Sequence, residues 1–305
     1  MVINKTKEEV RKIVFKFIRL TGLPALSRRF IQKDKVSILL FHDISKETAE
    51  KSFDYLTGKY NIIGLYDFIK ACEKRDQSML PKKAMIITLD DGVKRNFELL
   101  PVFKKYKIPV TLFLCSSIIN TKRHFWFNYS QPGISVTKLK YKTNKEKLEI
   151  LAKYGFEQKK EYDTPQALTK RQVDKMKGIV NMESHTRFHP CLPKCKPAEA
   201  KKEIIESKKI LEKEFNLGIN AISYPNGDYS EREIAYSKEA GYKCGLTVDF
   251  GFNSIKSDLF RLKRLCVNDA DDINELIVKA SGVWDFFKTL NGKRQKFGWT
   301  DNIVQ

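Results

Sequence analysis

The chain has 305 residues, of which 57 are lysine or arginine, 37 are aspartate or glutamate and only four are histidine. This length suits one large α/β domain or two smaller ones, and the 42% hydrophobic content excludes a wholly disordered basic chain. Every apolar run is far shorter than the roughly 20 residues that a membrane-spanning helix needs. The net charge of +20 comes without an Arg-Gly-aromatic or zinc-finger pattern, so we expect no nucleic-acid partner. It indicates a dispersed basic surface or contact with an acidic partner.

Residues 1–34 are predicted to form a basic amphipathic segment. Gly-Leu-Pro at 22–24 is expected to end or kink its helix. Two roles stay open: contact with an anionic membrane surface, or packing on the flank of the chain's own domain. Because basic residues interrupt the apolar positions, we see no secretory signal and expect a cytoplasmic protein, peripheral on the inner membrane face in the first case. The helical spacing runs over residues 7–31 through Val10, Ile13, Val14, Phe17 and Ile18.

Residues 35–290 alternate between strand and helix patterns. About seven strand patterns in this arrangement favour an α/β fold, a parallel (β/α) barrel, over an open sheet. A stretch at about 120–165 interrupts the rhythm, and we expect it to be an insertion that covers a substrate. Residues 291–305 are expected to be a C-terminal tail. Six strand patterns lie at 36–43, 84–89, 109–115, 179–183, 221–224 and 244–248. Four helix patterns lie at 93–106, 169–177, 197–215 and 230–240, and a last strand and helix follow between 262 and 287.

Polar side chains follow several of the predicted strands. His42 follows the first strand, and Asp90-Asp91-Gly92 follows the second. An adjacent carboxylate pair allows one group to bind a cation while the other accepts a proton, although an ordinary Asp-Gly turn has the same sequence. Ser223-Tyr-Pro-Asn-Gly227 ends a later strand. This motif is either an ordinary loop corner or a turn that directs a backbone N–H toward a site.

Two histidines follow the strand at 179–183. An i, i+4 spacing puts the His185 and His189 rings on one face if the segment turns helically, which suits a shared divalent ion. A competing interpretation combines them with Cys191 and Cys195 in a Cys2His2 structural zinc site.

In this order, the motifs resemble the NodB-homology polysaccharide deacetylases, carbohydrate esterase family 4. Asp-Asp-Gly, His-Thr-x-x-His-Pro and Tyr-Pro-x-Gly carry the resemblance, which covers roughly residues 36–270. It implies a distorted (β/α)7-type barrel and metal-dependent removal of the N-acetyl group from an acetylated amino sugar in a cell-surface glycan or its precursor. Zn²⁺ is the expected ion, and Co²⁺, Ni²⁺ or Mn²⁺ suits the same ligands. Position by position, the resemblance implies Asp91, His185 and His189 as metal ligands, Asp90 as catalytic base and the Asn226 N–H as oxyanion donor.

The chain departs from the family pattern at three points, since it lacks the third-motif arginine, the Asp-x-x-Asp-Trp motif and the Leu-x-His motif near the usual C-terminus. Ser223 replaces the arginine that usually opens the third motif, and Arg264 is our candidate for the group that holds Asp90 instead. No histidine follows Asn226, and Phe41-His42-Asp43 resembles the rearranged order of poly-N-acetylglucosamine deacetylases. That order implies His42 as the general acid. The lost arginine leaves an alternative, a catalytically inactive saccharide-binding protein with the same fold.

Three aromatic residues are candidates for saccharide contact. Trp126 and Tyr129 lie in the insertion, and Tyr224 lies in the Tyr-Pro-x-Gly motif. Sugar rings stack on such side chains through their apolar faces, but Trp126 and Tyr129 would equally well pack the insertion onto the barrel. His124, the fourth histidine, is left without a role.

Overall fold

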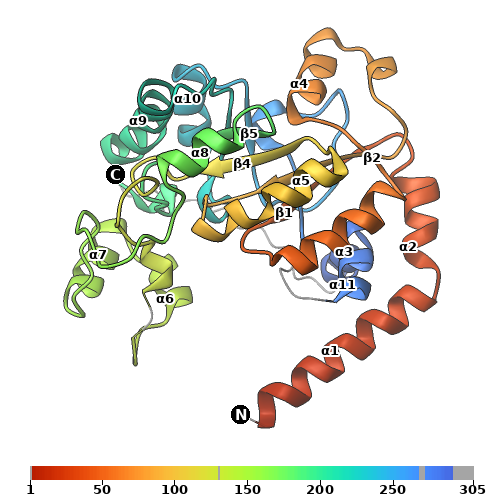
Figure 1. The fold of residues 1–305 in the computed structure, drawn as a ribbon, viewed down its shortest axis with the longest axis horizontal. Helices are drawn as coiled ribbons and strands as arrows, with labels where there is room; N and C mark the ends of the chain where they lie inside the picture. Colours follow the sequence, from red (N-terminus) through yellow and green to blue (C-terminus); the bar gives the residue numbers. More distant parts are fainter. Residues whose placement is uncertain (1, 130, 268–271, 291–305) are drawn as a thin grey trace.

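The computed structural model describes residues 2–129, 131–267 and 272–290 (Figure 1). The predicted tail at 291–305 lies outside the described residues. In the described part of the chain, no helix is both long and apolar enough to cross a bilayer.

A parallel sheet forms the centre of the fold. Its strands are ordered β7-β6-β5-β4-β3-β1-β8, and β2 also pairs with β3. Every residue of β1, β3 and β4 is buried, as expected for parallel strands that have the barrel interior on one side and helices on the other. The strands are β1 Val36–Phe41, β2 Asn61–Ile62, β3 Ala84–Leu89, β4 Val110–Leu114, β5 Val180–Ser184, β6 Ala221–Ser223, β7 Cys244–Leu246 and β8 Leu265–Cys266.

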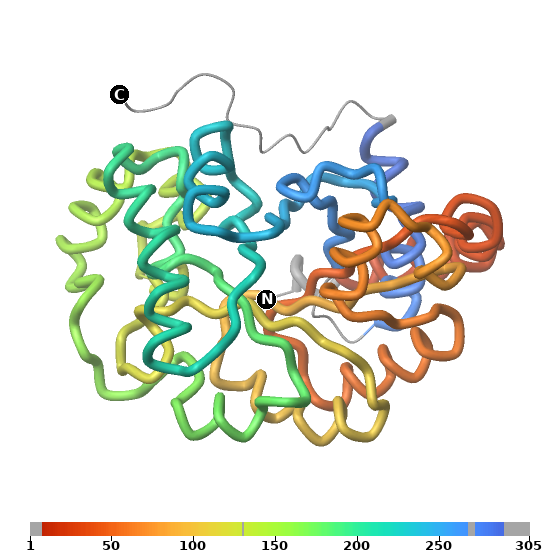
Figure 2. Tube along the Cα trace, turned by 90° about the horizontal axis from the view of Figure 1, so that it is seen from above, coloured from red at the N-terminus to blue at the C-terminus, as the bar shows by residue number. Residues whose placement is uncertain are grey.

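The short segment 262–266 connects the two ends of this sheet. Leu262 forms a parallel bridge with Leu246 of β7, and three residues later Leu265 pairs with Leu39 of β1. The sheet therefore curls into an uneven barrel, seen from above in Figure 2. The predicted distorted (β/α) barrel is confirmed.

Helices cover the outside of the sheet (Figure 1). The predicted helix at 93–106 begins as a 3-10 helix, Lys94–Leu99, and becomes α-helical where Pro101 occupies a first-turn position that needs no N–H donor. Residues 44–83, for which the sequence predicts no element, form α3, β2 and α4. The outer helices are α3 Lys46–Thr57, α4 Leu65–Lys74, α5 Leu100–Tyr106, α8 Lys170–Met176, α9 Pro197–Phe215, α10 Glu231–Glu239, α11 Ile273–Ala280 and α12 Val283–Leu290.

The N-terminal segment forms a long helix followed by a break. Helix α1 (Val2–Leu20) ends before Gly22, which has a φ of 76°, and α2 (Leu23–Leu26) continues into a π-helical turn at Ser27–Ile31. The predicted break at 22–24 is thus confirmed. One face of α1 packs on the barrel's flank, where Phe15 lies in a buried cluster with Val278 and Val283.

The insertion has a small core of its own. The 3-10 turn Trp126–Asn128, helix α6 (Val136–Lys140) and helix α7 (Asn144–Ala152) supply it with Trp126, Leu139 and Leu151. His124 stacks on Tyr162 with ring centroids 4.2 Å apart, and its Nε2 lies 2.9 Å from the Thr164 carbonyl oxygen. The fourth histidine therefore holds the insertion together.

Candidate active site

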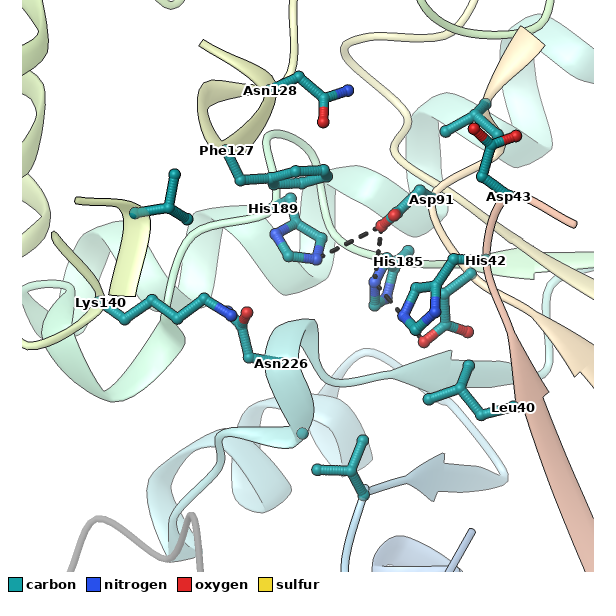
Figure 3. Close-up of a pocket in the computed structure, with 15 residues that line it drawn as sticks. Leu40, His42, Asp43, Asp91, Phe127, Asn128, Lys140, His185, His189 and Asn226 are labelled. Atoms are coloured by element: carbon teal, nitrogen blue, oxygen red, sulfur yellow. Dashed lines mark ion pairs between the residues drawn. The ribbon is translucent and has the colours of Figure 1, made fainter. Parts of the chain in front are cut away.

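A cavity of about 360 Å³ opens at the carboxyl ends of the strands (Figure 3). The loops after β1, β3, β5 and β6 line one side of it. The insertion lines the other side with Phe127, Asn128, Val136 and Lys140, so it borders the cavity as expected of a segment on the active face. The barrel contributes Leu40, His42, Asp43, Asp90, Asp91, Val93, His185, His189, Asn226, Gly227 and Val248.

A left-handed turn brings both adjacent aspartates to this cavity. The Asp90 N–H donates to the Phe41 carbonyl at 3.0 Å, which extends the pairing of β3 with β1 by one residue. Asp91 and Gly92 then have φ angles of 74° and 70°. A Cβ at Gly92 would lie 2.6 Å from Leu114 Cδ2. Both this close contact and the positive φ require glycine at this position.

Asp91, His185 and His189 converge within the cavity. The Asp91 Oδ1 atom lies 3.4 Å from Nε2 of each histidine, and one ligand atom from each residue lies within 4.8 Å of the others. All three side chains are buried, and Asp91 Oδ1 has no hydrogen-bond partner in the described structure. The three residues expected as metal ligands thus lie together in the structure.

This donor set fits a divalent metal ion. His185 Nδ1 lies 2.7 Å from the Ser223 carbonyl oxygen, which leaves Nε2 directed at the cavity, as in many metal-binding histidines. Burial, opposed only in part by Asp91, lowers the pKa of His189 to about 3. Its ring is therefore neutral at physiological pH and has a lone pair available for a cation.

The loop that carries the two histidines is not helical. Thr186 and His189 have φ angles of 64° and 57°, and Glu203 Oε2 accepts hydrogen bonds from the Arg187 and Phe188 N–H groups at 2.9 Å each. The two histidine rings therefore lie together as predicted, but the helical turn expected from their i, i+4 spacing is wrong. A buried carboxylate on α9, not a helical turn, holds the loop.

The alternative Cys2His2 zinc site is wrong. Among the described residues, His185 and His189 share their potential metal position with Asp91 and with neither cysteine. Cys191 Sγ instead accepts a hydrogen bond from Asn226 Nδ2 at 3.4 Å, and the buried Cys195 thiol lies 3.7 Å from the Cys191 carbonyl oxygen.

Arg264 clamps the carboxylate of Asp90. Its two terminal nitrogens donate to the two Asp90 oxygens at 2.9 Å each, and one of them also reaches Ser223 Oγ at 2.8 Å. Ser223 Oγ donates to Asp90 Oδ2 at 2.9 Å, while Arg264 Nε donates to the Thr247 carbonyl at 2.8 Å. The predicted contact between Arg264 and Asp90 is present, and Ser223 leaves room for it.

Charge balance sets the protonation state of Asp90. Burial disfavours its ionised form, but the Arg264 guanidinium, helped by His185, outweighs burial and holds the pKa of the carboxyl well below its usual range. Asp90 is therefore an ionised, fully enclosed carboxylate that faces the cavity.

His42 lines the cavity directly after β1, next to His185 in Figure 3. Its ring is exposed and points toward the Asp91–His185 side of the cavity in Figure 3. Asn96 Nδ2 donates to the His42 carbonyl at 2.9 Å and fixes the backbone there. The neighbouring Asp43 forms an ion pair with Arg95 at 2.7 Å.

Asn226 forms the floor of the cavity in a left-handed conformation. Its φ and ψ angles are 56° and 4°, and the following Gly227 has a φ of 74°. A Cβ at Gly227 would lie 2.3 Å from Val248 Cγ2, so the Pro-x-Gly corner requires this glycine. The bond from Asn226 Nδ2 to Cys191 anchors the corner to the histidine loop.

None of the three aromatic candidates for saccharide contact lines the cavity, and burial corrects the prediction for Trp126 and Tyr224, whereas the half-buried Tyr129 stays a prediction. Trp126 is 2% exposed and its Nε1 donates to the His189 carbonyl at 2.7 Å, so it packs the insertion onto the barrel. Tyr224 is fully buried and stacks on Tyr229. The Tyr129 hydroxyl donates to the Tyr154 carbonyl at 2.5 Å within the insertion.

Sequence reasoning missed several residues of the site. Phe127 packs edge-on against His189 with ring centroids 4.7 Å apart, and Asn128 and Lys140, which also line the cavity, carry no motif of their own. Phe127 and Asn128 lie within the aromatic run Arg123–Tyr129. The run therefore identified the correct segment, but its cavity-lining side chains are Phe127 and Asn128 and not Trp126 and Tyr129.

A comparison with protein families matches residues 77–245 to the polysaccharide deacetylase family. The chain belongs to this family. The matched region contains Asp90, Asp91, His185, His189 and Asn226 but neither His42 nor Arg264. These two residues of the polysaccharide deacetylase site therefore lie on either side of the region that the family description covers.

Individual relatives agree with this assignment. The protein YxkH of Bacillus subtilis is 26% identical over 188 residues, 61% of this chain and 52% of that protein. A poly-β-1,6-N-acetyl-D-glucosamine N-deacetylase of Staphylococcus epidermidis is 26% identical over 234 residues, 73% of this chain and 65% of that enzyme. The chain thus spans about half to two thirds of the length of these relatives. A solved structure, the Streptococcus pyogenes deacetylase PplD with acetate, shares the fold with a TM-score of 0.60 at 19% identity, over 81% of this chain and 98% of that one.

Proposed function

We propose that this polysaccharide deacetylase hydrolyses the N-acetyl group of an acetylated amino sugar in a cell-surface glycan or its precursor. One observation carries the proposal: the ionised Asp90, clamped by Arg264, lies beside the Asp91–His185–His189 donor set in one cavity. The Staphylococcus epidermidis relative, which is named for removing acetyl groups from poly-N-acetylglucosamine, supports the same substrate class.

The residues divide the proton transfers between them. Asp91, His185 and His189 would hold a divalent ion, most simply Zn²⁺, which would supply polarisation of the amide carbonyl and a lowered pKa of bound water. Asp90 accepts the proton of the attacking water, and Arg264 keeps this base ionised and fixed in orientation. His42 faces the same cavity from β1 and donates a proton to the departing amine.

The Asn226 corner stabilises the charge that develops on the carbonyl oxygen. Its left-handed conformation turns the backbone at the cavity floor, where an N–H donor to an oxyanion is typically worth on the order of 3 kcal/mol. Because Gly227 and the Cys191 contact fix this conformation before substrate arrives, the donor needs no reorganisation during the reaction.

Acetate release from N-acetylglucosamine oligomers tests the proposal. Protein loaded with Zn²⁺ or Co²⁺ should release acetate, and a chelator should abolish the release. Asp90→Asn and His42→Ala should each lower kcat at least about 100-fold, since each removes a proton-transfer group. Asp174→Asn, which changes an exposed carboxylate paired with lysines on α8, is the matched control and should keep full activity.

The catalytically inactive alternative gives a different result in the same assay. It predicts no acetate under any metal loading, while calorimetry still detects oligosaccharide binding. That combination would refute the proposed hydrolysis.

A further inference from the structure

Helix α1 exposes an apolar stripe to solvent. Ile13, Phe17 and Leu20 are 66%, 69% and 74% exposed, values far above those of apolar residues that pack on a barrel. They recur at the i, i+3, i+4 and i+7 spacing of a single helix face. We call this face the α1 stripe, and it consists of Val10, Ile13, Val14, Phe17 and Leu20.

The opposite side of the helix is anchored to the barrel. Phe15 is 2% exposed and stacks against Trp284 with ring centroids 4.7 Å apart, and Arg11 forms an ion pair with Glu275 of α11. Arg19 donates to the Asn274 side chain at 2.9 Å. These contacts fix the rotation of α1, so the stripe faces outward as a consequence of how the helix docks.

The anchored helix lies along the outer edge of the molecule and projects beyond α11 (Figure 1). Apolar exposure continues after the break at Gly22, where Leu26 and Phe30 are 51% and 67% exposed. Isolated exposed apolar residues are common on soluble proteins, but a row of this length marks an interaction surface.

The charge around the stripe selects the partner. Residues 8–35 contain eight lysines and arginines against three acidic residues. Two copies of this chain meeting through the stripe would bring these like charges together, whereas an anionic surface would be attracted to them. Apolar residues flanked by Lys12, Lys16, Arg28 and Arg29 have the composition of a helix that lies in a lipid headgroup layer.

We propose that the α1 stripe binds an anionic lipid bilayer, with its apolar side chains in the headgroup region and the flanking cations on lipid phosphates. Docking of α1 on α11 presents the stripe without any unfolding of the barrel. The polysaccharide deacetylase site would thereby be held at a membrane surface.

Sedimentation with vesicles tests this binding independently of any deacetylase activity. The full chain should co-sediment with vesicles of phosphatidylcholine and phosphatidylglycerol at low salt, and binding should weaken at least tenfold in 0.5 M NaCl or with phosphatidylcholine alone. Ile13→Glu with Phe17→Glu should reduce binding at least tenfold. Both side chains are exposed, so circular dichroism and the unfolding midpoint should match those of the wild type.

A matched pair of charge variants separates the helix from the general basic surface. Lys12→Glu with Lys16→Glu should weaken binding several-fold more than Lys209→Glu with Lys213→Glu, which makes the same change at the same spacing on α9. Equal effects of the two pairs would overturn the proposal. Undiminished vesicle binding by the Ile13→Glu, Phe17→Glu variant would also overturn it. So would light scattering that shows a dimer of the wild type and a monomer of this variant.

Discussion

Replacing Arg264 with methionine removes the cation that balances the buried Asp90 carboxylate. Arg264 is 1% exposed and forms two hydrogen bonds to Asp90, together with one each to Ser223 Oγ and the Thr247 carbonyl. Breaking a buried pair from one side typically costs about 3–5 kcal/mol, because the remaining charge is left uncompensated. We therefore expect Arg264→Met to lower the free energy of unfolding by about this amount at neutral pH.

The pH dependence of this loss follows from the direction of the Asp90 pKa shift. A carboxyl whose pKa is depressed in the folded state stabilises the protein above its unfolded pKa, and that stabilisation is lost as pH falls through the folded value. In Arg264→Met the Asp90 pKa should rise, so the stability deficit should shrink toward acidic pH. The acid limb of kcat/KM should move to higher pH for the same reason.

Urea unfolding at several pH values and a pH–rate profile are the assays. Arg261→Met is the control, because Arg261 lies three residues before Arg264 and forms its ion pairs at the surface. It should change the free energy of unfolding by less than about 1 kcal/mol. Adding Ser223→Arg to Arg264→Met returns an arginine to the position that the resembled family uses, and it should recover part of the activity. An Arg264→Met variant with wild-type stability and an unchanged acid limb would refute the assignment of Arg264 as the group that positions Asp90.

Three further changes test other parts of the site. Gly227→Ala places a Cβ 2.3 Å from Val248 Cγ2 at a positive φ, so we expect urea denaturation to show a loss of at least about 2 kcal/mol. Cys191→Ala removes the acceptor for Asn226 Nδ2, and steady-state kinetics should show kcat lowered several-fold with KM unchanged, whereas a purely structural role predicts altered stability and unchanged kcat. Burial raises the pKa of Glu203 to about 7, so ionisation costs stability as pH rises from about 4.3 toward 7; the melting temperature of Glu203→Gln relative to wild type should therefore increase from pH 5 to pH 8, and a constant difference would contradict the raised pKa.

The periodic parts of the fold were predictable from the residues. Mainly apolar runs predicted strands at 36–43, 84–89 and 109–115, and the structure has barrel strands at 36–41, 84–89 and 110–114. Strand β2 has two residues, too few for any periodic pattern, and it was missed. Short elements of this kind depend on the neighbouring strand for their conformation, so local sequence carries little information about them.

The site was predictable where residue type limits the chemistry. Because the chain has only four histidines, the i, i+4 spacing of His185 and His189 indicated a shared ion, and the missing motif arginine pointed to Arg264 as the cation beside Asp90. The strained backbone at Asp91 and Asn226 was not predictable, because non-glycine residues rarely adopt positive φ. Tertiary packing imposes those conformations.

Aromatic residues were predicted least well. Trp126 and Tyr224 have the chemistry of sugar-stacking side chains, yet both are buried, because large apolar surface stabilises a core as readily as it binds a ligand. Composition does not separate these two uses. The side chains that do face the cavity, Phe127 and Asn128, follow Trp126 directly in the chain.

The segment 262–266, which joins β7 to β1, also carries Arg264, the counter-ion of the proposed catalytic base Asp90. Arg264 lies between Leu262 and Leu265, the residues whose pairings close the barrel. Burial of Asp90 and delivery of the guanidinium that compensates for this burial therefore depend on the same short segment. A substitution that loosens the closure at Leu262 or Leu265 would therefore also displace the group that orients Asp90.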